Sequence, residues 1–311
     1  MLTTKQNKSS LARKHELKQI WGDRYLYIML LPALAVTFFF SYVPMWGIIM
    51  SFQDFSIFKG VFGSKWVGLA NFQKILTQKS FLGAIWNTLA CSLLGLAINF
   101  WAPIVLALLL NELEHKIFKR VSQTISYLPH FLSWMSVIGI VHIMFGRDGL
   151  INDAMIALGA QERITFLAQQ DYFIWFVVFL SLWKEVGWGT IIHLANLSSV
   201  NQELYEAAKI DGANRLQQLW YITIPHMVPT IVILLIFQMG SIFGSNFELI
   251  YGLQNPFIDF EVISTIVYRT GIQNGNYSVA TALGFMQGLV ALVLVMITNW
   301  FAKKTTGSGI W

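Results

Sequence analysis

The sequence predicts an all-α membrane protein with six transmembrane helices. Hydrophobic residues make up 55% of the 311 residues, charged residues make up only 12%, and the mean hydropathy is +0.57. Soluble domains carry about 25% charged residues. The apolar residues also gather in stretches of about 20 residues, which is the length that an α-helix needs to cross the hydrocarbon core of a bilayer.

Six apolar stretches define the predicted spans. Their ranges are 25–50, 85–110, 123–145, 172–194, 229–251 and 278–301. Pro32 and Pro44 are expected to kink the first span, because proline lacks the backbone N–H of a helical hydrogen bond. After this span, Leu69, Phe72 and Ile75 recur at helical spacing and predict a short helix on the outer membrane interface.

Lysine and arginine residues set the predicted orientation, since six spans place both termini on one side of the membrane. Segments 1–24, 111–122, 195–228 and 303–311 hold six, three, two and two of these residues, whereas the other loops, 51–83, 146–171 and 252–277, hold four, two and one. Short cytoplasmic loops are enriched in Lys and Arg. The bias of thirteen to seven therefore predicts that both termini and loop 195–228 are cytoplasmic.

The same pattern divides the chain into four parts. These are a basic cytoplasmic segment (1–24), the first span with its outer loop (25–83), a core with the other five spans (84–302) and a cytoplasmic tail (303–311). The basic residues concentrate near membrane boundaries, which favours contact with lipid over binding of nucleic acid.

The longest polar interruption in the second half of the chain lies inside the predicted cytoplasmic loop. A helix is predicted at Gln202–Ile210 and ends at Asp211-Gly212, because glycine adopts the left-handed conformation past a helix C-terminus at little steric cost. A second helix is predicted over 213–222, stopping at Pro225, with Asp211 as a candidate cap of its N-terminus. The loop pairs no nucleophile with a base, so it is interpreted as a docking surface.

This loop resembles the EAA loop of permease subunits of binding-protein-dependent ABC importers. The resemblance rests on Glu206-Ala207-Ala208, on Gly212, and on Ile222-x-Ile224-Pro225, where the family pattern has Leu in place of Ile224. It implies that residues 202–228 form a coupling loop for a separate ATPase subunit. Glu206 would then meet a basic group of that subunit, Ala207 and Ala208 would keep the helix slim, and Gly212 would fix the turn. Purely local helix and turn roles remain open for each residue.

Two outer segments are similar to the carbohydrate branch of these permeases, namely Trp66-x-Gly68-Leu69-x-Asn71-Phe72 and the run from Glu248 to Gly275. The resemblance implies a type I importer fold and ATP-driven import of a sugar, in particular an oligosaccharide, across the bacterial cell membrane by alternating access. It further implies a second related permease subunit, two copies of a cytoplasmic subunit that binds ATP and Mg, and an extracellular lipoprotein that binds the sugar. A homodimer stays open, although the resemblance favours a heterodimer.

Polar residues recur inside the predicted fifth span. Gln238, Ser241, Ser245 and Glu248 share one side at helical spacing, and Asn246 lies close to the same face. Because polar groups are costly in lipid, this stripe is expected to face a wet cavity or another helix. Sugar contact and interhelical hydrogen bonding both remain open.

The predicted fourth span carries two charges near its middle, Lys184 and Glu185, close to Trp188. These charges must face protein or water. Neighbours on a helix do not face one another, so the two need not pair with each other. A structural or gating ion pair is favoured over substrate contact. Trp188 is either a surface for a sugar ring or an interfacial or packing residue.

Glycines spaced four residues apart occur in the last two spans, as Gly240 with Gly244 and Gly284 with Gly288. Small residues at this spacing let helix backbones approach closely. Helix packing is therefore the primary interpretation, and a moving seam or pore wall is the alternative.

Several kinds of chemistry find no support in the sequence. There is no G-x-x-x-x-G-K-[ST] phosphate loop, the only cysteine is Cys91, and no two of the six histidines stand four residues apart. The chain is therefore predicted not to be an enzyme and to hold no cofactor or metal. The alternative to an ABC permease is a secondary carrier or channel for a small polar solute. That class predicts inverted repeats and leaves the docking loop unexplained.

Overall fold

The computed structural model describes residues 22–244, 246–307 and 309–310. Within these residues six helical stretches are long and apolar enough to cross a membrane, namely Arg24–Phe52, Lys79–Asn111, Trp134–Ala157, Gln170–Ser198, Arg215–Gly240 and Tyr277–Thr306. The predicted fold class is thereby confirmed. The predicted basic segment 1–24 lies almost entirely outside the described residues.

The elements of the first half are α2 (Arg24–Thr37), η1 (Phe38–Tyr42), η2 (Val43–Phe52), β1 (Gln53–Asp54), α3 (Gly60–Gly63), β2 (Lys65–Trp66), α4 (Ala70–Thr77), α5 (Lys79–Ile98), α6 (Trp101–Asn111), α7 (Lys116–Tyr127), η3 (Leu128–Phe131) and α8 (Trp134–Phe145). They are followed by α9 (Leu150–Ala157), η4 (Phe166–Ala168), α10 (Gln170–Ser198), α11 (Gln202–Ile210), α12 (Arg215–Gln218), η5 (Leu219–Thr223), α13 (Ile224–Gly240), α14 (Phe247–Leu253), α15 (Ile263–Tyr268), η6 (Arg269–Gln273) and α16 (Tyr277–Thr306). The elements η1, η5 and η6 are π-helical, and the other η elements are 3-10 helices.

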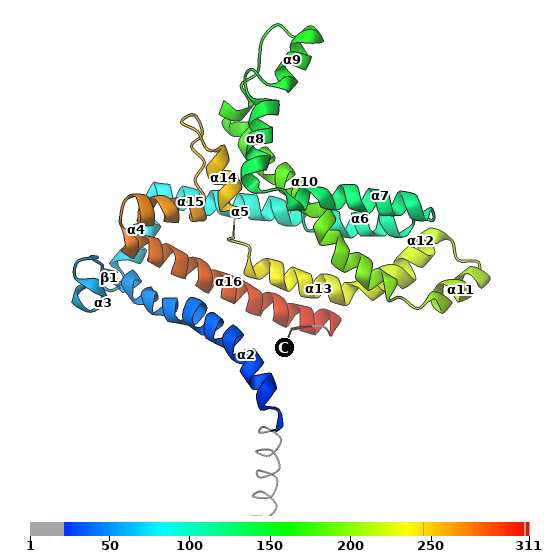
Figure 1. The fold of residues 1–311 in the computed structure, drawn as a ribbon, viewed down its shortest axis with the longest axis horizontal. Helices are drawn as coiled ribbons and strands as arrows, with labels where there is room; N and C mark the ends of the chain where they lie inside the picture. Colours follow the sequence, from blue (N-terminus) through cyan, green and yellow to red (C-terminus); the bar gives the residue numbers. More distant parts are fainter. Residues whose placement is uncertain (1–21, 245, 308, 311) are drawn as a thin grey trace, which may run out of the picture.

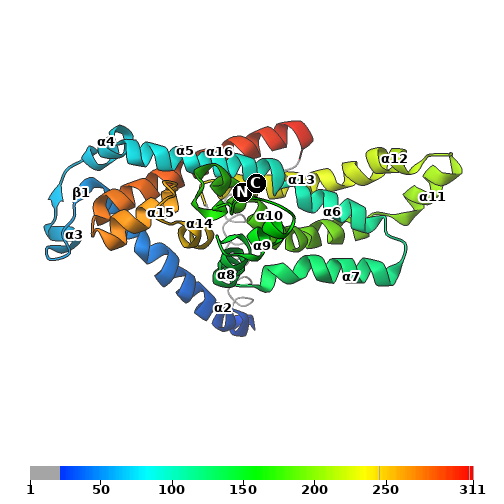
Figure 2. The same cartoon turned by 90° about the horizontal axis from the view of Figure 1, so that it is seen from above.

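Several long helices run along the longest axis of the molecule, whereas α8 and α9 project sideways from its middle. Figures 1 and 2 show α5, α6, α13 and α16 along this axis. The α11–α12 hairpin lies at one end, while β1, α3, α4 and α15 lie at the other. Loop 195–228 and the first outer loop are therefore on opposite ends, as alternating spans require.

The first span changes helix type along its length. Pro32 lies inside α2 without interrupting it, whereas Pro44 stands at the start of the 3-10 helix η2. None of the residues in α2 is buried within this chain. Figure 1 shows α2 diverging from the body, and η2 packs on α16.

The third predicted span, 123–145, is wrong as a single helix. α7 ends at Tyr127, and the following 3-10 turn has Pro129 near its start. Proline cannot continue the hydrogen bonds of α7. Ser133 is extended and begins α8 by accepting a hydrogen bond from the N–H of Ser136 at 3.1 Å. In Figure 1 α8 turns away from the direction of α7.

The fifth span begins and ends earlier than predicted. α12, η5 and α13 form one continuous stretch, Arg215–Gly240, so Pro225 does not stop the helix. The π turn before Pro225, in which the N–H of Ile224 donates to the carbonyl of Leu219, widens the helix and makes room for the proline ring. At Ser241 the chain leaves the helix, and it resumes as α14.

The first outer loop contains a small antiparallel hairpin, in which Gln53 pairs with Trp66 and Asp54 with Lys65. The predicted short helix follows as α4. Ile75 of this helix is fully buried, and α4 packs on α5 and α16. This helix is therefore part of the folded body.

Three apolar clusters fix the helices around one another. One joins α8, α10 and α14, and a second joins α4, α5, α15 and α16. The third brings together α6, α10 and α13 through Ile104, Ala107, Leu197 and Met227. The third cluster joins α10, which leads into α11, to α13, which follows α12 and η5.

Candidate functional site

Helix α11 occupies the predicted range, Gln202–Ile210. Asn201 caps its N-terminus, since the side-chain Oδ1 accepts a hydrogen bond from the N–H of Glu203 at 3.0 Å. Glu206 and Ala207 are exposed, whereas Ala208 is half-buried. The helix thus presents the start of the sequence motif to the outside of the chain.

A Schellman motif closes the other end of α11. The N–H of Ala213 donates to the carbonyl of Ala208 at 2.8 Å, and the N–H of Gly212 donates to the carbonyl of Lys209 at 3.1 Å. Gly212 has a φ of +80°, which is in the left-handed region that favours glycine. The turn that was predicted at Gly212 is therefore present.

Asp211 does not cap the next helix, and this prediction was wrong. Asn214 does so in a capping box, where its Oδ1 accepts from the N–H of Gln217 at 2.9 Å and Gln217 Oε1 accepts from the N–H of Asn214 at 2.8 Å. The Schellman motif uses the residues after Asp211 to end α11, so α12 starts only at Arg215.

Two polar contacts join the α11–α12 hairpin to the spans. The hydroxyl of Tyr205 lies 2.8 Å from Thr223 Oγ1, which connects α11 to the base of the fifth span. Arg215 donates to Glu114 Oε1 at 2.8 Å, which connects α12 to the loop that follows the second span. The ion pair is exposed, so it orients the hairpin and contributes little stability.

Large apolar side chains are exposed on and next to this hairpin. Ile210 is 87% exposed, and the other members of this apolar surface are Leu204, Leu216, Trp220 and Tyr221. Exposed apolar surface of this kind marks a contact with another protein or with the membrane.

A cavity of about 550 Å³ lies between α5, α6, α10, α13 and the turn after α13. Its polar lining consists of Ser92, Asn99, Ser181, Glu185, His193, Gln238, Ser241 and Asn246. Aromatic lining comes from Phe100, Trp188 and Phe237. Aromatic and apolar walls with a few convergent polar groups are typical of sites for small molecules.

Most of the residues that the sequence marked as candidates for sugar contact lie at this cavity. They do not form the continuous helical stripe that was predicted. The helical stripe in the fifth span is wrong, because the helix ends at Gly240 and Asn246 instead caps α14. Glu248 lies exposed on α14, and Ser245 is outside the described residues. The predicted residues that do line the cavity are Glu185, Trp188, Gln238, Ser241 and Asn246.

The charges of the fourth span form a compact cluster with the broken third span. Lys184 is 5% exposed; its Nζ donates to the carbonyl of His130 at 2.8 Å and lies 3.3 Å from Glu185 Oε1. The second carboxylate oxygen of Glu185 lies 2.8 Å from His130 Nδ1. The His130 ring stacks on Trp188 with centroids 4.3 Å apart. Glu185 and Trp188 thus face the cavity, while Lys184 and His130 hold them from behind.

The glycine pairs play different parts within the chain. A Cβ on Gly240 would come within 3.2 Å of Val295, so this position permits close packing of α13 on α16. Gly244 lies in the turn after α13, where a Cβ would come within 3.0 Å of the carbonyl oxygen of Ser241, so it does not form a helical pair with Gly240. No atom lies within 4 Å of a Cβ on Gly284 or Gly288, which line an apolar groove instead. Packing of these two against another chain stays a prediction.

Three residues near the cavity were missed at the sequence level. His130 lies 55 positions before Glu185, and no local pattern links the two. His193 stands eight residues after Glu185, which leaves the two side chains about 80° apart around α10, so spacing alone did not single it out. Asn99 lies between α5 and α6, and no local pattern distinguishes it.

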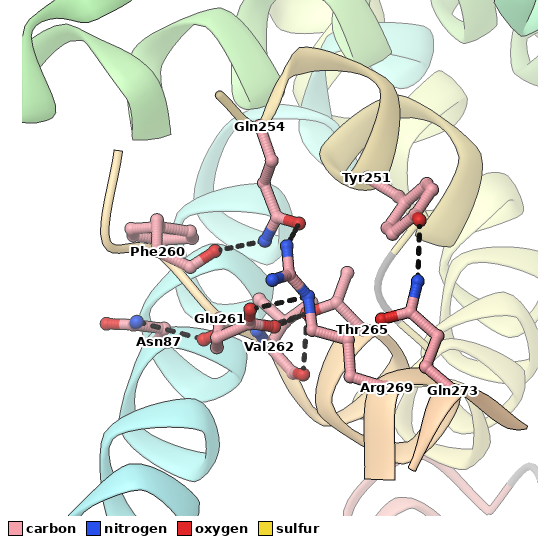
Figure 3. Close-up of polar contacts among 9 residues, drawn as sticks. All are labelled: Asn87, Tyr251, Gln254, Phe260, Glu261, Val262, Thr265, Arg269 and Gln273. Atoms are coloured by element: carbon pink, nitrogen blue, oxygen red, sulfur yellow. Dashed lines mark hydrogen bonds and ion pairs between the residues drawn. The ribbon is translucent and has the colours of Figure 1, made fainter. Parts of the chain in front are cut away.

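A polar network holds the outer segment between α14 and α15 (Figure 3). Arg269 contacts Glu261 at 2.9 Å and donates to Gln254 Oε1 at 2.9 Å. Glu261 also accepts from the hydroxyl of Thr265 at 2.5 Å, and its backbone carbonyl accepts from Asn87 of α5 at 2.9 Å. The network fixes this loop against the body at the end of the molecule that carries β1 and α4. Among the described residues, no group of His, Cys, Asp and Glu is arranged to hold a metal ion.

A membrane protein with six apolar spans, a polar-lined cavity and an exposed helical hairpin at one end belongs to the class of membrane transport components. The chain belongs to the family of binding-protein-dependent transport system inner membrane components, which it matches over residues 99–305. It is accordingly a multi-pass permease of an ABC transport system and not an enzyme.

Two relatives from Bacillus subtilis (strain 168) cover almost the whole chain. The chain is 42% identical to the polygalacturonan/rhamnogalacturonan transport system permease protein YteP over 302 residues, which span 96% of this chain and 94% of that protein. It is 40% identical to the protein LplB over 291 residues, which span 93% of this chain and 91% of LplB.

Solved structures show the same architecture. A chain from the crystal structure of a bacterial alginate ABC transporter, in complex with an alginate pentasaccharide-bound periplasmic protein, superposes with a TM-score of 0.86. The two chains are 38% identical, and the match covers 94% of this chain and 99% of the other.

Proposed function

We propose that this chain is one permease subunit of an ATP-driven importer for an oligosaccharide, and that the cavity is its share of the sugar path. The observation that carries the proposal is the connection between cavity and hairpin. α10 contributes Glu185, Trp188 and His193 to the cavity and leads into α11, while the fifth span contributes Gln238 and starts at the other end of the same hairpin. Movement of α11 is thereby transmitted to both cavity walls.

In this proposal α11 docks on a separate cytoplasmic ATPase. Exposed Glu206 faces a basic group of that subunit, exposed Ala207 lets the helix enter a groove, and Ile210 covers apolar surface. Closure of the ATPase rocks the fourth and fifth spans and changes the side to which the cavity opens. Such a cycle requires that the sugar interacts differently with the two states.

The oligosaccharide class rests on the relatives. One relative is a permease for polygalacturonan and rhamnogalacturonan, and the structural neighbour belongs to an alginate transporter. The lining supports a sugar because hydrogen-bonding groups and the flat face of Trp188 stand in the same cavity.

The remaining partners belong to the proposal as well. A second, related permease subunit would complete a heterodimer, and two copies of the ATPase would bind ATP and Mg. An extracellular lipoprotein would deliver the sugar to the outer loops 51–83, 146–171 and 252–277. The network around Glu261 and Arg269 supports this docking role, since it ties the last of these loops to α5. The cytoplasmic position of both termini remains a prediction from charge.

Reconstitution tests the proposal. The chain is co-expressed with the permease, ATPase and binding protein encoded beside it, and oligosaccharide uptake into proteoliposomes is measured by mass spectrometry. We expect uptake only when all subunits and ATP are present. Glu206→Lys should abolish ATPase binding, whereas Glu203→Lys in the first turn of the same helix should reduce it less. Uptake by this chain alone, without ATPase, would contradict the proposal and support a secondary carrier.

A further inference from the structure

We infer that Glu185 and Trp188 together bind one pyranose unit of the oligosaccharide, and that His130 is the residue that positions both. Two neighbouring hydroxyls of the sugar donate to the carboxylate, while the sugar ring lies on the indole. The inference rests on the proposed function and names the part of the sugar that its cavity recognises.

Both contact side chains are open to the cavity. The side chain of Glu185 is 44% exposed, Trp188 is 47% exposed, and both line the cavity. Three residues separate them on α10, which leaves them about 60° apart around the helix axis and about 4.5 Å apart along it. One sugar ring can therefore reach the carboxylate and the indole at the same time.

The carboxylate of Glu185 keeps acceptor positions for a ligand. An ionised carboxylate offers about four lone-pair positions on its two oxygens. Lys184 Nζ lies 3.3 Å from Oε1, and His130 Nδ1 lies 2.8 Å from Oε2. Because a carboxylate only accepts, Nδ1 of His130 carries the proton of this hydrogen bond. Each oxygen thus has a position left, and two hydroxyls on adjacent sugar carbons can donate one hydrogen bond to each.

His130 also sets the plane of the indole. The two rings are stacked, with centroids 4.3 Å apart and planes inclined by 3°, so the imidazole covers one face of Trp188. The ring of Phe131 stands nearly perpendicular to the indole, with its centroid at 6.0 Å. The opposite face of the indole is left for a ligand, and the C–H groups of a sugar ring suit such a flat apolar surface.

His130 acts on this pair from behind. It belongs to η3, at the break of the third span, which packs on α10, and it is not one of the residues that line the cavity. Its backbone carbonyl accepts from Lys184 Nζ at 2.8 Å. One residue therefore holds the carboxylate through Nδ1, the indole through its ring and the ammonium through its backbone. Substitution of the side chain removes the first two contacts and keeps the third.

The charge of the cavity decides which part of a sugar is recognised. Lys184 is 5% exposed and does not line the cavity, and none of the described lining residues is Lys or Arg. The carboxylate of a uronate would therefore meet Glu185 without a compensating cation, and like charges repel. An acidic sugar is expected to bind through its hydroxyls with its own carboxylate turned away, and a neutral sugar binds in the same way.

The test follows Trp188 by fluorine NMR in the complete transporter, which is labelled with fluorotryptophan and placed in nanodiscs without the binding protein. The Trp188 resonance is assigned by its absence in Trp188→Phe. One probe is a partial hydrolysate of plant cell walls. The second is the same hydrolysate with its hydroxyls methylated and its carboxylates left free. All complexes are purified by size-exclusion chromatography, so that a lower yield does not enter the titration.

Three variants separate the two contacts of His130. His130→Phe keeps a stacked ring without the N–H donor, His130→Asn keeps an N–H donor without the ring, and His130→Leu keeps neither. His142→Leu on α8, which does not line the cavity, is the matched control. We expect the first two variants to raise the half-saturating concentration about fivefold each, and His130→Leu to raise it by more than about tenfold. The control should titrate like the wild type.

The wild-type resonance should shift saturably with the hydrolysate and stay unchanged with the methylated one. Uptake by the same complexes, with the binding protein added, is measured in proteoliposomes by mass spectrometry. If the wild type imports sugar but its Trp188 resonance does not respond, or responds equally to the methylated probe, the inference is overturned and the proposed function stands. A titration of His130→Leu that equals the wild type would also overturn it. If the wild type imports no sugar at all, the proposed function fails, and the inference fails with it.

Discussion

The structure of the α11–α12 hairpin follows from neighbouring residues, whereas the structure of the cavity wall depends on contacts between distant parts of the chain. In the hairpin, the helix range, the turn at Gly212 and the exposure of Glu206 agree with what adjacent residues specify. At the cavity, most of the predicted residues meet in one place, but through a broken helix and a cluster with His130 that local sequence does not specify. The hairpin is built from short-range contacts, whereas the cavity is built from long-range ones. Mutations at the cavity should therefore lower the yield of folded protein, whereas mutations in the hairpin should lower uptake and ATPase binding.

The largest effect is expected from Glu185→Leu. This change leaves the buried ammonium of Lys184 with the His130 carbonyl and the face of the Trp134 ring but with no opposite charge. Removing one partner of a buried ion pair costs about 3–5 kcal/mol, and a value near 3 is reasonable here because Glu185 is half exposed to the cavity. We expect a strong loss of folded protein, measured by detergent-extracted yield and fluorescence size-exclusion chromatography.

A double variant separates folding from transport at this position. Glu185→Leu combined with Lys184→Met removes both charges, which is often neutral for stability. We expect the yield to recover while sugar uptake stays low, because the cavity has lost its carboxylate. Recovery of both yield and uptake would show that the pair is purely structural and that Glu185 does not contact the sugar.

The next effect concerns the hairpin, through Gly212→Val. Valine is strained at a φ of +80°, because its Cβ clashes in the left-handed conformation, at a cost of about 1–2 kcal/mol or more. We expect uptake to fall about tenfold and ATPase binding to weaken, with the yield nearly unchanged. Gly307→Val is the matched control, since Gly307 has a φ of +69° at the end of α16, away from the hairpin. Equal loss of uptake in both variants would contradict a coupling role.

Features that depend on residues close together in the sequence could be predicted from it. Apolar stretches specified the number of spans, and the Gly212 turn specified the end of α11. It did not predict that Pro225 stays inside a helix, because the compensating π turn has no recognisable residue pattern. It also could not place His130 beside Glu185, because that contact depends on where the third span breaks and how α10 packs on it.

A smaller effect should come from the outer network through Arg269→Met. Arg269 is 44% exposed and Glu261 24%, so the pair contributes about 1 kcal/mol or less. We expect stimulation of ATP hydrolysis by the binding protein to fall about threefold, with unstimulated hydrolysis unchanged. Arg269→Lys should be intermediate, because an ammonium keeps the charge but cannot bridge Glu261 and Gln254 as a guanidinium does. Unchanged stimulation would remove this loop from the docking surface.

The smallest effect is expected at the hydrogen bond that connects α11 to the base of the fifth span. Tyr205→Phe removes the hydrogen bond to Thr223 and leaves the ring in place. The bond is worth about 1 kcal/mol. Thr223 is buried and retains a contact of 3.4 Å to the carbonyl of Gln218, which softens the loss. We expect uptake to fall about twofold while ATP hydrolysis is unchanged, so that more ATP is used for each sugar.

A double-mutant cycle with Thr223→Val decides what this loss means. If the hydrogen bond itself transmits movement from α11 to the fifth span, each single variant should raise the ratio of ATP hydrolysed to sugar imported, and the double variant should raise it no further. Additive effects would instead show that the two side chains act independently. In that case the apolar cluster that contains Leu197 and Met227, together with the 3.1 Å hydrogen bond between Ser199 Oγ and His226 Nε2, links the ends of α10 and α13 next to the hairpin.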